Sequence, residues 1–199
     1  MGKISRRSKL WQVEYALKSC EHGRAEQGAK DAKIIRLELE KLIKDFTFKP
    51  THPSVEDFNI PKPEREAGDI EPLDYDIYDK QGNLIAHVDF TGSNYQLLDP
   101  NASDYSKIMP VTEYKGNFMK QSKEPCYVIF WMKREHSPVK DACVWIRGEN
   151  VIKCHTEWGY LGGKPQFNYM TEHKDWHRGL DSFIEELKRI ARQPYGNRR

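Results

Sequence analysis

The stretch DYDIYDKQGNLIAHVDFTGSN, from Asp74 to Asn94, predicts a β-hairpin. Residues Asp74 to Tyr78 alternate acidic and apolar side chains, the period of two that is typical of a strand with one polar face. The segment Lys80 to Asn83 has the composition of a tight turn, because glycine and asparagine tolerate positive φ. Leu84 to Thr91 then forms the return strand, so the sequence predicts two antiparallel strands.

The return strand separates its side chains into an apolar face and a polar face. The apolar face holds Ala86, Val88 and Phe90, and the polar face holds His87, Asp89 and Thr91. Acids of both strands therefore project from one side of the hairpin. Neighbouring carboxylates at the edge of a core are costly unless they bind a cation, so we expect a divalent metal ion there.

The remaining patterns place this hairpin in an α/β fold with a mixed β-sheet flanked by helices. Apolar residues recur at helical spacing over three ranges, and continuous apolar runs predict strands. We expect helices at 8–20, 25–46 and 181–192, strands at 126–132, 142–147 and 151–153, and an irregular connection at 47–72. Residues 111–122 are ambiguous, because Thr112 favours a short helix and Gly116 disfavours one.

Length and composition favour one intracellular domain covering residues 1–199. Mean hydropathy is −0.82, and no apolar run approaches the roughly 18 residues of a membrane span. The N-terminus is basic without the apolar segment of a signal peptide. The four cysteines show no CxxC spacing, which favours reduced thiols and a cytoplasmic location.

Charge is distributed unevenly along the chain. Residues 1–50 carry 12 basic and 7 acidic side chains, residues 51–110 carry 4 and 12, and residues 111–199 carry 16 and 11. An acidic centre thus lies between two basic segments. A metal-dependent enzyme acting on a polyanion needs this combination, since acids bind the metal and cations attract the phosphates.

A helix with an acid near its start, a hairpin carrying an Asp and then a second acid, and a later buried strand together resemble the PD-(D/E)XK nuclease superfamily. This superfamily includes archaeal Holliday junction resolvases and restriction endonucleases. The resemblance covers about residues 20–155, and it leaves 156–199 as an aromatic C-terminal extension. It implies a restriction-endonuclease-like fold with Asp76 and Asp89 as Mg²⁺ (or Mn²⁺) ligands, Asp74 as an alternative ligand, and Glu26 as the helix acid, with Glu21 behind it.

The sequence departs from the family pattern at one catalytic position. The family's lysine is due two residues after Asp89, where this chain has Thr91. Some members of the superfamily supply this lysine from the next helix, and Lys115 is then the best candidate, ahead of Lys107 and Lys120. A second alternative is that Glu113-Tyr114-Lys115 is itself the acid-x-lysine tripeptide, with Asp104 or Asp99 upstream; a third is a site that binds nucleic acid without cleaving it.

Two further groups of residues allow other interpretations. Cys143, Cys154, His155, His173 and His177 are of the types that bind zinc, although no CxxC or CxxH pair is present. Trp158, Tyr160, Phe167, Tyr169 and Trp176 either stack on bases or form a second hydrophobic cluster.

The resemblance therefore implies a metal-dependent DNA endonuclease that hydrolyses phosphodiester bonds, with branched, viral or mobile-element DNA as expected substrates. DNA is the expected partner, a homodimer is compatible with this class, and no membrane partner is expected. The alternatives are an inactive nucleic-acid-binding protein of the same fold and a zinc-stabilised interaction module.

Overall fold

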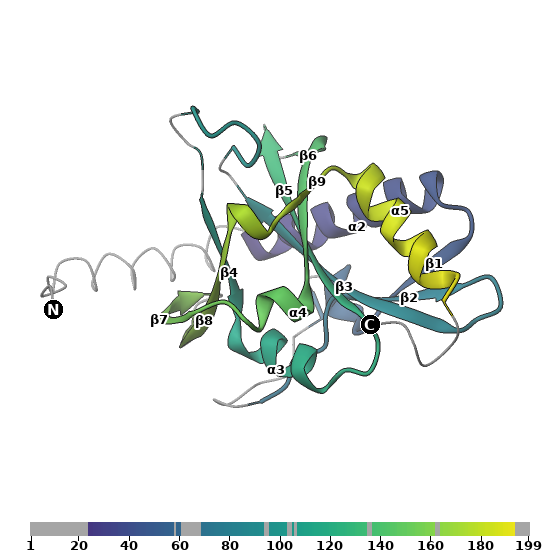
Figure 1. The fold of residues 1–199 in the computed structure, drawn as a ribbon, viewed down its shortest axis with the longest axis horizontal. Helices are drawn as coiled ribbons and strands as arrows, with labels where there is room; N and C mark the ends of the chain where they lie inside the picture. Colours follow the sequence, from purple (N-terminus) through teal and green to yellow (C-terminus); the bar gives the residue numbers. More distant parts are fainter. Residues whose placement is uncertain are drawn as a thin grey trace, which may run out of the picture.

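The computed structural model describes residues 24–57, 59–60, 69–93, 96–102, 105, 107–134, 137–161 and 164–193. The helices are α2 (Arg24–Leu42), α3 (Glu113–Gln121), α4 (Gly148–Val151) and α5 (Leu180–Ala191), with short 3-10 turns at Pro53–Val55 and His173–Asp175. The strands are β1 (Phe46–Pro50), β2 (Tyr75–Asp79), β3 (Leu84–Ser93), β4 (Ile108–Thr112), β5 (Cys126–Arg134), β6 (Ser137–Arg147), β7 (Thr156–Leu161), β8 (Lys164–Glu172) and β9 (His177–Arg178). The fold is mixed α/β, as the sequence predicts (Figure 1).

A six-stranded mixed sheet forms the centre of the molecule, in the order β1-β2-β3-β5-β6-β9. The predicted hairpin is its β2–β3 pair, and Gly82 in the connecting turn has φ of 82°. β3 and β5 run parallel, whereas the other neighbours in this sheet are antiparallel. The parallel pair requires a crossover connection, which here contains β4 and α3.

Each face of this sheet carries its own hydrophobic cluster. Alternate residues of β2, β3 and β5, among them Tyr75, Val88 and Ile129, pack with α2 and α5 on one face. The other face holds Val128 and Phe130 with residues of α3, α4 and β8. The polar face of the hairpin is therefore largely covered, because the crossover brings α3 over it.

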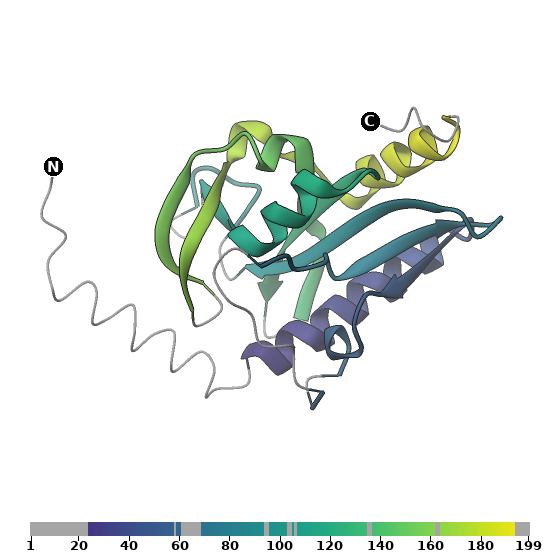
Figure 2. The ribbon, with the colours of Figure 1, turned by 90° about the horizontal axis from the view of Figure 1, so that it is seen from below.

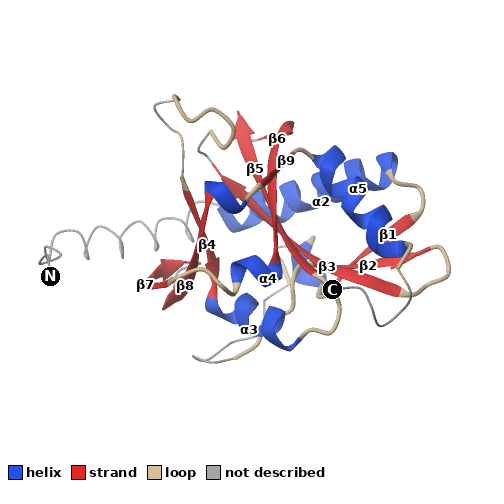
Figure 3. Ribbon diagram, viewed as in Figure 1, coloured by secondary structure: helices blue, strands red, loops and turns tan. Residues whose placement is uncertain are grey.

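A second sheet of three strands, in the order β4-β8-β7, packs beside the second cluster. Figure 3 shows this sheet at one end of the molecule, with α2 and α5 toward the other. The segment predicted as a C-terminal extension contributes to both clusters, since Phe183 and Leu187 belong to one and Tyr169 and Trp176 to the other.

Several local predictions need correction. The connection predicted at 47–72 contains β1, and the ambiguous segment around Thr112 is β4 followed by α3. Residues 151–153, predicted as a strand, instead begin with the last residue of the short helix α4. The helix at 25–46 ends at Leu42, and the helix predicted at 8–20 lies outside the described residues.

Candidate functional site

Two acids of the hairpin meet on the face that α3 covers. Tyr75 pairs with Val88 in the β2–β3 register, so the preceding residue Asp74 lies across from Asp89. The Asp89 side chain is only 1% exposed. Asp74 is held by the backbone N–H of Phe90, which donates to Oδ2 at 3.0 Å. Two carboxylates thus lie together in a mostly buried position.

Lys115, in the first turn of α3, is the cation between these acids. Its Nζ contacts Oδ1 of Asp89 directly and lies 3.4 Å from Oδ1 of Asp74. The lysine side chain is 14% exposed, so this is a shielded cluster rather than a surface ion pair. The sequence-based choice of Lys115 therefore identifies a lysine that the fold places beside Asp89.

Gly116 explains how α3 comes close enough to deliver this lysine. A Cβ at this position would lie 2.1 Å from Cε2 of Tyr169, so only glycine leaves room for the tyrosine ring. The residue that weakened the helix prediction is thus required by packing. The ring of Tyr169 on β8 fixes the helix next to the lysine.

Thr91, at the position where the family has its lysine, orients the Asp89 carboxylate. Its Oγ1 donates to Oδ2 of Asp89 at 3.0 Å, while Oδ1 faces Lys115. Burial alone would raise the pKa of Asp89, but the charge of Lys115 and hydrogen bonds from Lys115 and Thr91 hold this pKa below its usual value. Burial would likewise lower the pKa of Lys115, and the charges of Asp74 and Asp89 raise it instead. The folded state therefore favours the charged forms of both Asp89 and Lys115.

Asp76 lies outside this cluster. It pairs with His87 one step along the hairpin, where its Oδ1 is 2.6 Å from Nδ1 of the imidazole. This imidazole and the ring of Phe118 form an edge-to-face pair with centroids 4.9 Å apart. The strand register shifts between Ile77 and Tyr78, and this irregularity brings Asp74, rather than Asp76, across from Asp89. Counting outward from the turn alone does not give this pairing.

Glu71 is a further acid near the site. Glu71 contributes a further negative charge near Lys115, and its backbone N–H donates to the carbonyl of Tyr114 at 3.1 Å. Sequence reasoning missed it, because it belongs to a segment without periodicity. Glu26 falls in the first turn of α2, but its side chain is outside the described residues, as is Glu21.

The pair Asp74 and Asp89 fits a hard divalent cation in donor chemistry, since both present carboxylate oxygens to one cationic centre. Among the described residues, no group of three or more His, Cys, Asp or Glu side chains is placed to hold a metal. Two carboxylates are nevertheless enough for Mg²⁺, which keeps several water ligands. The residues that remain candidates for metal binding are therefore Asp74 and Asp89, with Glu71 nearby.

The residues of the zinc alternative are dispersed. Cys143 is buried in the cluster beneath α2 and α5, whereas Cys154 packs against the cluster on the opposite face of the sheet. His177 stacks on Trp145 with ring centroids 4.2 Å apart, and His155 lies 3.2 Å from Glu157. The fold therefore does not assemble these side chains around one point.

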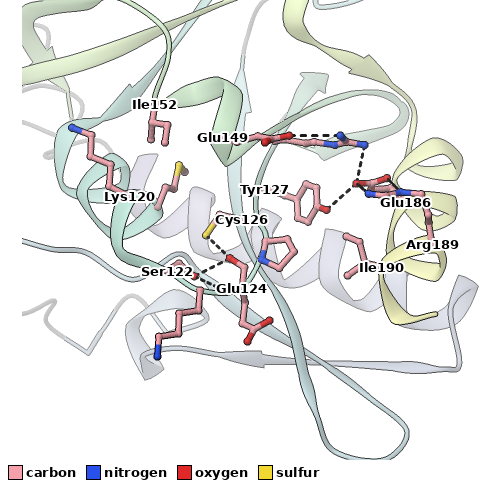
Figure 4. Close-up of a pocket in the computed structure, with 14 residues that line it drawn as sticks. Lys120, Ser122, Glu124, Cys126, Tyr127, Glu149, Ile152, Glu186, Arg189 and Ile190 are labelled. Atoms are coloured by element: carbon pink, nitrogen blue, oxygen red, sulfur yellow. Dashed lines mark hydrogen bonds and ion pairs between the residues drawn. The ribbon is translucent and has the colours of Figure 1, made fainter. Parts of the chain in front are cut away.

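A cavity of about 320 Å³ lies at the other end of α3, between Lys120, Cys126, Arg147 and α5 (Figure 4). It contains neither acid of the hairpin nor Lys115. Its wall carries Glu186, which accepts hydrogen bonds from Tyr127 at 3.0 Å and from Arg189 at 2.9 Å. Burial alone would raise the pKa of Glu186. The hydrogen bonds from Arg189 and Tyr127 outweigh burial, so this pKa lies below its usual value. This network ties α5 to the sheet.

Comparisons with known proteins return no match: no family model matches the sequence, no curated protein is similar enough to match, and no solved structure matches the fold. Among the helices that the structure describes, none is both long and apolar enough to cross a membrane.

Proposed function

We propose that this protein is a Mg²⁺-dependent nuclease of the PD-(D/E)XK type. The observation that carries the proposal is the convergence of Lys115 on Asp89 and Asp74, although the lysine lies 26 residues beyond Asp89 in the chain. The order of elements also supports it: α2, the β2–β3 hairpin and then the buried strand β5 follow the order on which the resemblance rests.

Each residue of the cluster has a role in phosphodiester hydrolysis. Asp74 and Asp89 would hold the cation, with Thr91 fixing the direction of the Asp89 carboxylate. The bound cation would supply an acidified water and polarise the phosphoryl oxygen. Lys115 would place its positive charge against the developing charge on the phosphate. Because its ammonium is held charged by two acids, Lys115 acts as an electrostatic stabiliser rather than as a base.

DNA is the substrate class that we propose, with branched or mobile-element DNA as the first structures to try. An acidic centre enclosed by basic segments suits a polyanion, whose phosphates bind cations while the carboxylates hold the metal. The same proposal includes a homodimer and an intracellular location for the protein.

Cleavage of a supercoiled plasmid and of a synthetic four-way junction, in Mg²⁺ and in Mn²⁺, tests this function. Asp89→Asn, Asp74→Asn and Lys115→Ala are expected to lose about 100-fold or more in rate, as removal of a charge-stabilising group does. Asp76→Asn is the matched control, because it removes a carboxylate of the same hairpin that pairs with His87 instead. Equal loss in all four variants, or full activity in Asp89→Asn, would contradict the proposed site.

A non-catalytic nucleic-acid-binding protein is the second candidate. It is favoured by Thr91 in the family's lysine position and by the fact that Lys115 already neutralises the acids. Wild-type protein that binds DNA in a gel-shift assay but cuts no substrate in either metal would support this function over the first.

A further inference from the structure

Two aromatic side chains project from the β7–β8 hairpin into solvent. Trp158 is 62% exposed and Phe167 is 44% exposed, which makes Trp158 the most exposed large apolar residue in the described part of the chain. They are direct cross-strand partners, and their rings form an edge-to-face pair with centroids 5.0 Å apart. Exposed aromatic side chains that lie in contact with one another on the surface indicate an interaction site.

The position of the pair links it to the candidate site. Phe167 lies two residues from Tyr169 on β8 and so shares its face, and Tyr169 packs against Gly116, next to Lys115. Thr112, the last residue of β4, pairs with Asn168. Phe167 therefore lies beside the junction between β4 and α3. Figure 2 shows the hairpin extending beside α3 at this end of the helix.

The face that carries the pair has no acidic side chain among the described residues of β7 and β8, so it does not repel a polyanion. The described side chains of β7 and β8 on this face are Thr156, Trp158, Phe167, Tyr169 and Thr171, none of which is acidic. Alternation places Glu157 and Glu172 on the opposite face. Lys120 adds a cation to the aromatic face, with Nζ 5.3 Å from the centre of the Tyr169 ring.

We propose that Trp158 and Phe167 form a stacking site for an unpaired nucleobase. The inference rests on the proposed function and narrows its substrate class to nucleic acid with single-stranded bases near the cleaved phosphate. Base stacking on an aromatic ring needs an open π-face and tolerates any base, whereas paired bases of a duplex are already stacked on their neighbours. The pair would thus select flaps, gaps or branch points over continuous duplex.

Binding of a labelled single-stranded DNA oligonucleotide, compared with a duplex of the same length, tests the inference by fluorescence anisotropy in EDTA. Trp158→Ala and Phe167→Ala are expected to weaken single-strand binding about fivefold or more and to leave duplex binding unchanged. Trp158→Phe should retain affinity, because it keeps a ring. Leu37→Ala is the control, since Leu37 is an apolar residue on α2 that is 40% exposed.

Tryptophan emission gives a second readout. Among the described tryptophans, Trp131, Trp145 and Trp176 are buried and Trp158 is exposed. A base that stacks on the pair is therefore expected to quench the emission of Trp158. Unchanged single-strand affinity in Trp158→Ala and Phe167→Ala, or an equal loss for duplex, would overturn the inference. The inference would also be overturned if these variants changed from dimer to monomer in sedimentation while DNA binding stayed intact. The aromatic pair would then be an interface between two copies of the chain.

The metal-free assay separates this inference from the cleavage proposal. Weaker single-strand binding by Trp158→Ala in a protein that cuts nothing would retain the stacking site and reject the nuclease. Normal binding by Trp158→Ala in a protein whose Asp89→Asn variant loses cleavage would retain the nuclease and reject the stacking site.

Discussion

Replacing Lys115 with methionine is the sharpest test of whether Asp74 and Asp89 form a cation site. Methionine keeps much of the side-chain volume and removes the charge that both carboxylates contact. Leaving a buried charge without its partner costs about 3–5 kcal/mol of unfolding free energy. We expect the lower end of this range, because Asp74 is 12% exposed and water can reach it.

A divalent ion should recover much of this loss. A ligand at about 100 times its dissociation constant stabilises the folded state by about 2.7 kcal/mol. The magnesium ion would take the place of the lost ammonium between two carboxylates. The wild-type protein should gain less from magnesium, because Lys115 competes for the same oxygens.

Urea unfolding followed by tryptophan fluorescence, with and without magnesium chloride at constant ionic strength, measures both effects. Lys120→Met is the matched control on the same helix, since Lys120 is exposed and lies over Tyr169, a contact worth about 0.5–1 kcal/mol. Two results would refute the reasoning: a loss below about 1 kcal/mol in Lys115→Met, or a clear loss that magnesium does not reduce.

Three further changes have definite expected outcomes. Gly116→Ala should cost about 1–3 kcal/mol in urea unfolding, because its methyl group would overlap the Tyr169 ring; a neutral result would contradict the tight packing. Thr91→Val should cost about 1 kcal/mol by removing one hydrogen bond to Asp89, and Thr91→Ser should cost less. The folded state lowers the pKa of Glu186, so its stabilising contribution is present above the ordinary value of 4.5 and is lost as pH falls through the folded value. The stability difference between wild type and Glu186→Gln should therefore shrink in acid, and a difference that grows in acid would oppose this.

The elements with strong periodicity could be predicted from the sequence. The hairpin, the parallel partner strand β5 and the helix α5 follow from alternation, from an apolar run and from helical spacing, since each pattern reflects burial on a defined face. Lys115 was selected by its position after the hairpin rather than by any local pattern, and the structure places it in contact with Asp89.

What sequence reasoning missed depends on tertiary contacts. β1 contains Pro50 and alternates only briefly, so it becomes a strand because β2 offers it an open edge. The position of Asp74 across from Asp89 depends on a register shift between Ile77 and Tyr78 that no local pattern in the sequence indicates. The helix α3 forms despite Gly116, because the ring of Tyr169, more than fifty residues away, occupies the space that a side chain would need.

The parallel pairing of β3 with β5 has a consequence for the order of folding. The hairpin closes across a short turn, so it brings Asp74 and Asp89 together early, whereas β5 can join β3 only after the chain between them has looped back. We therefore expect the two carboxylates to face each other without Lys115 until that crossover docks. Their repulsion opposes the hairpin during this interval and disappears when α3 arrives. The slow, long-range step of folding is thus also the step that neutralises the site.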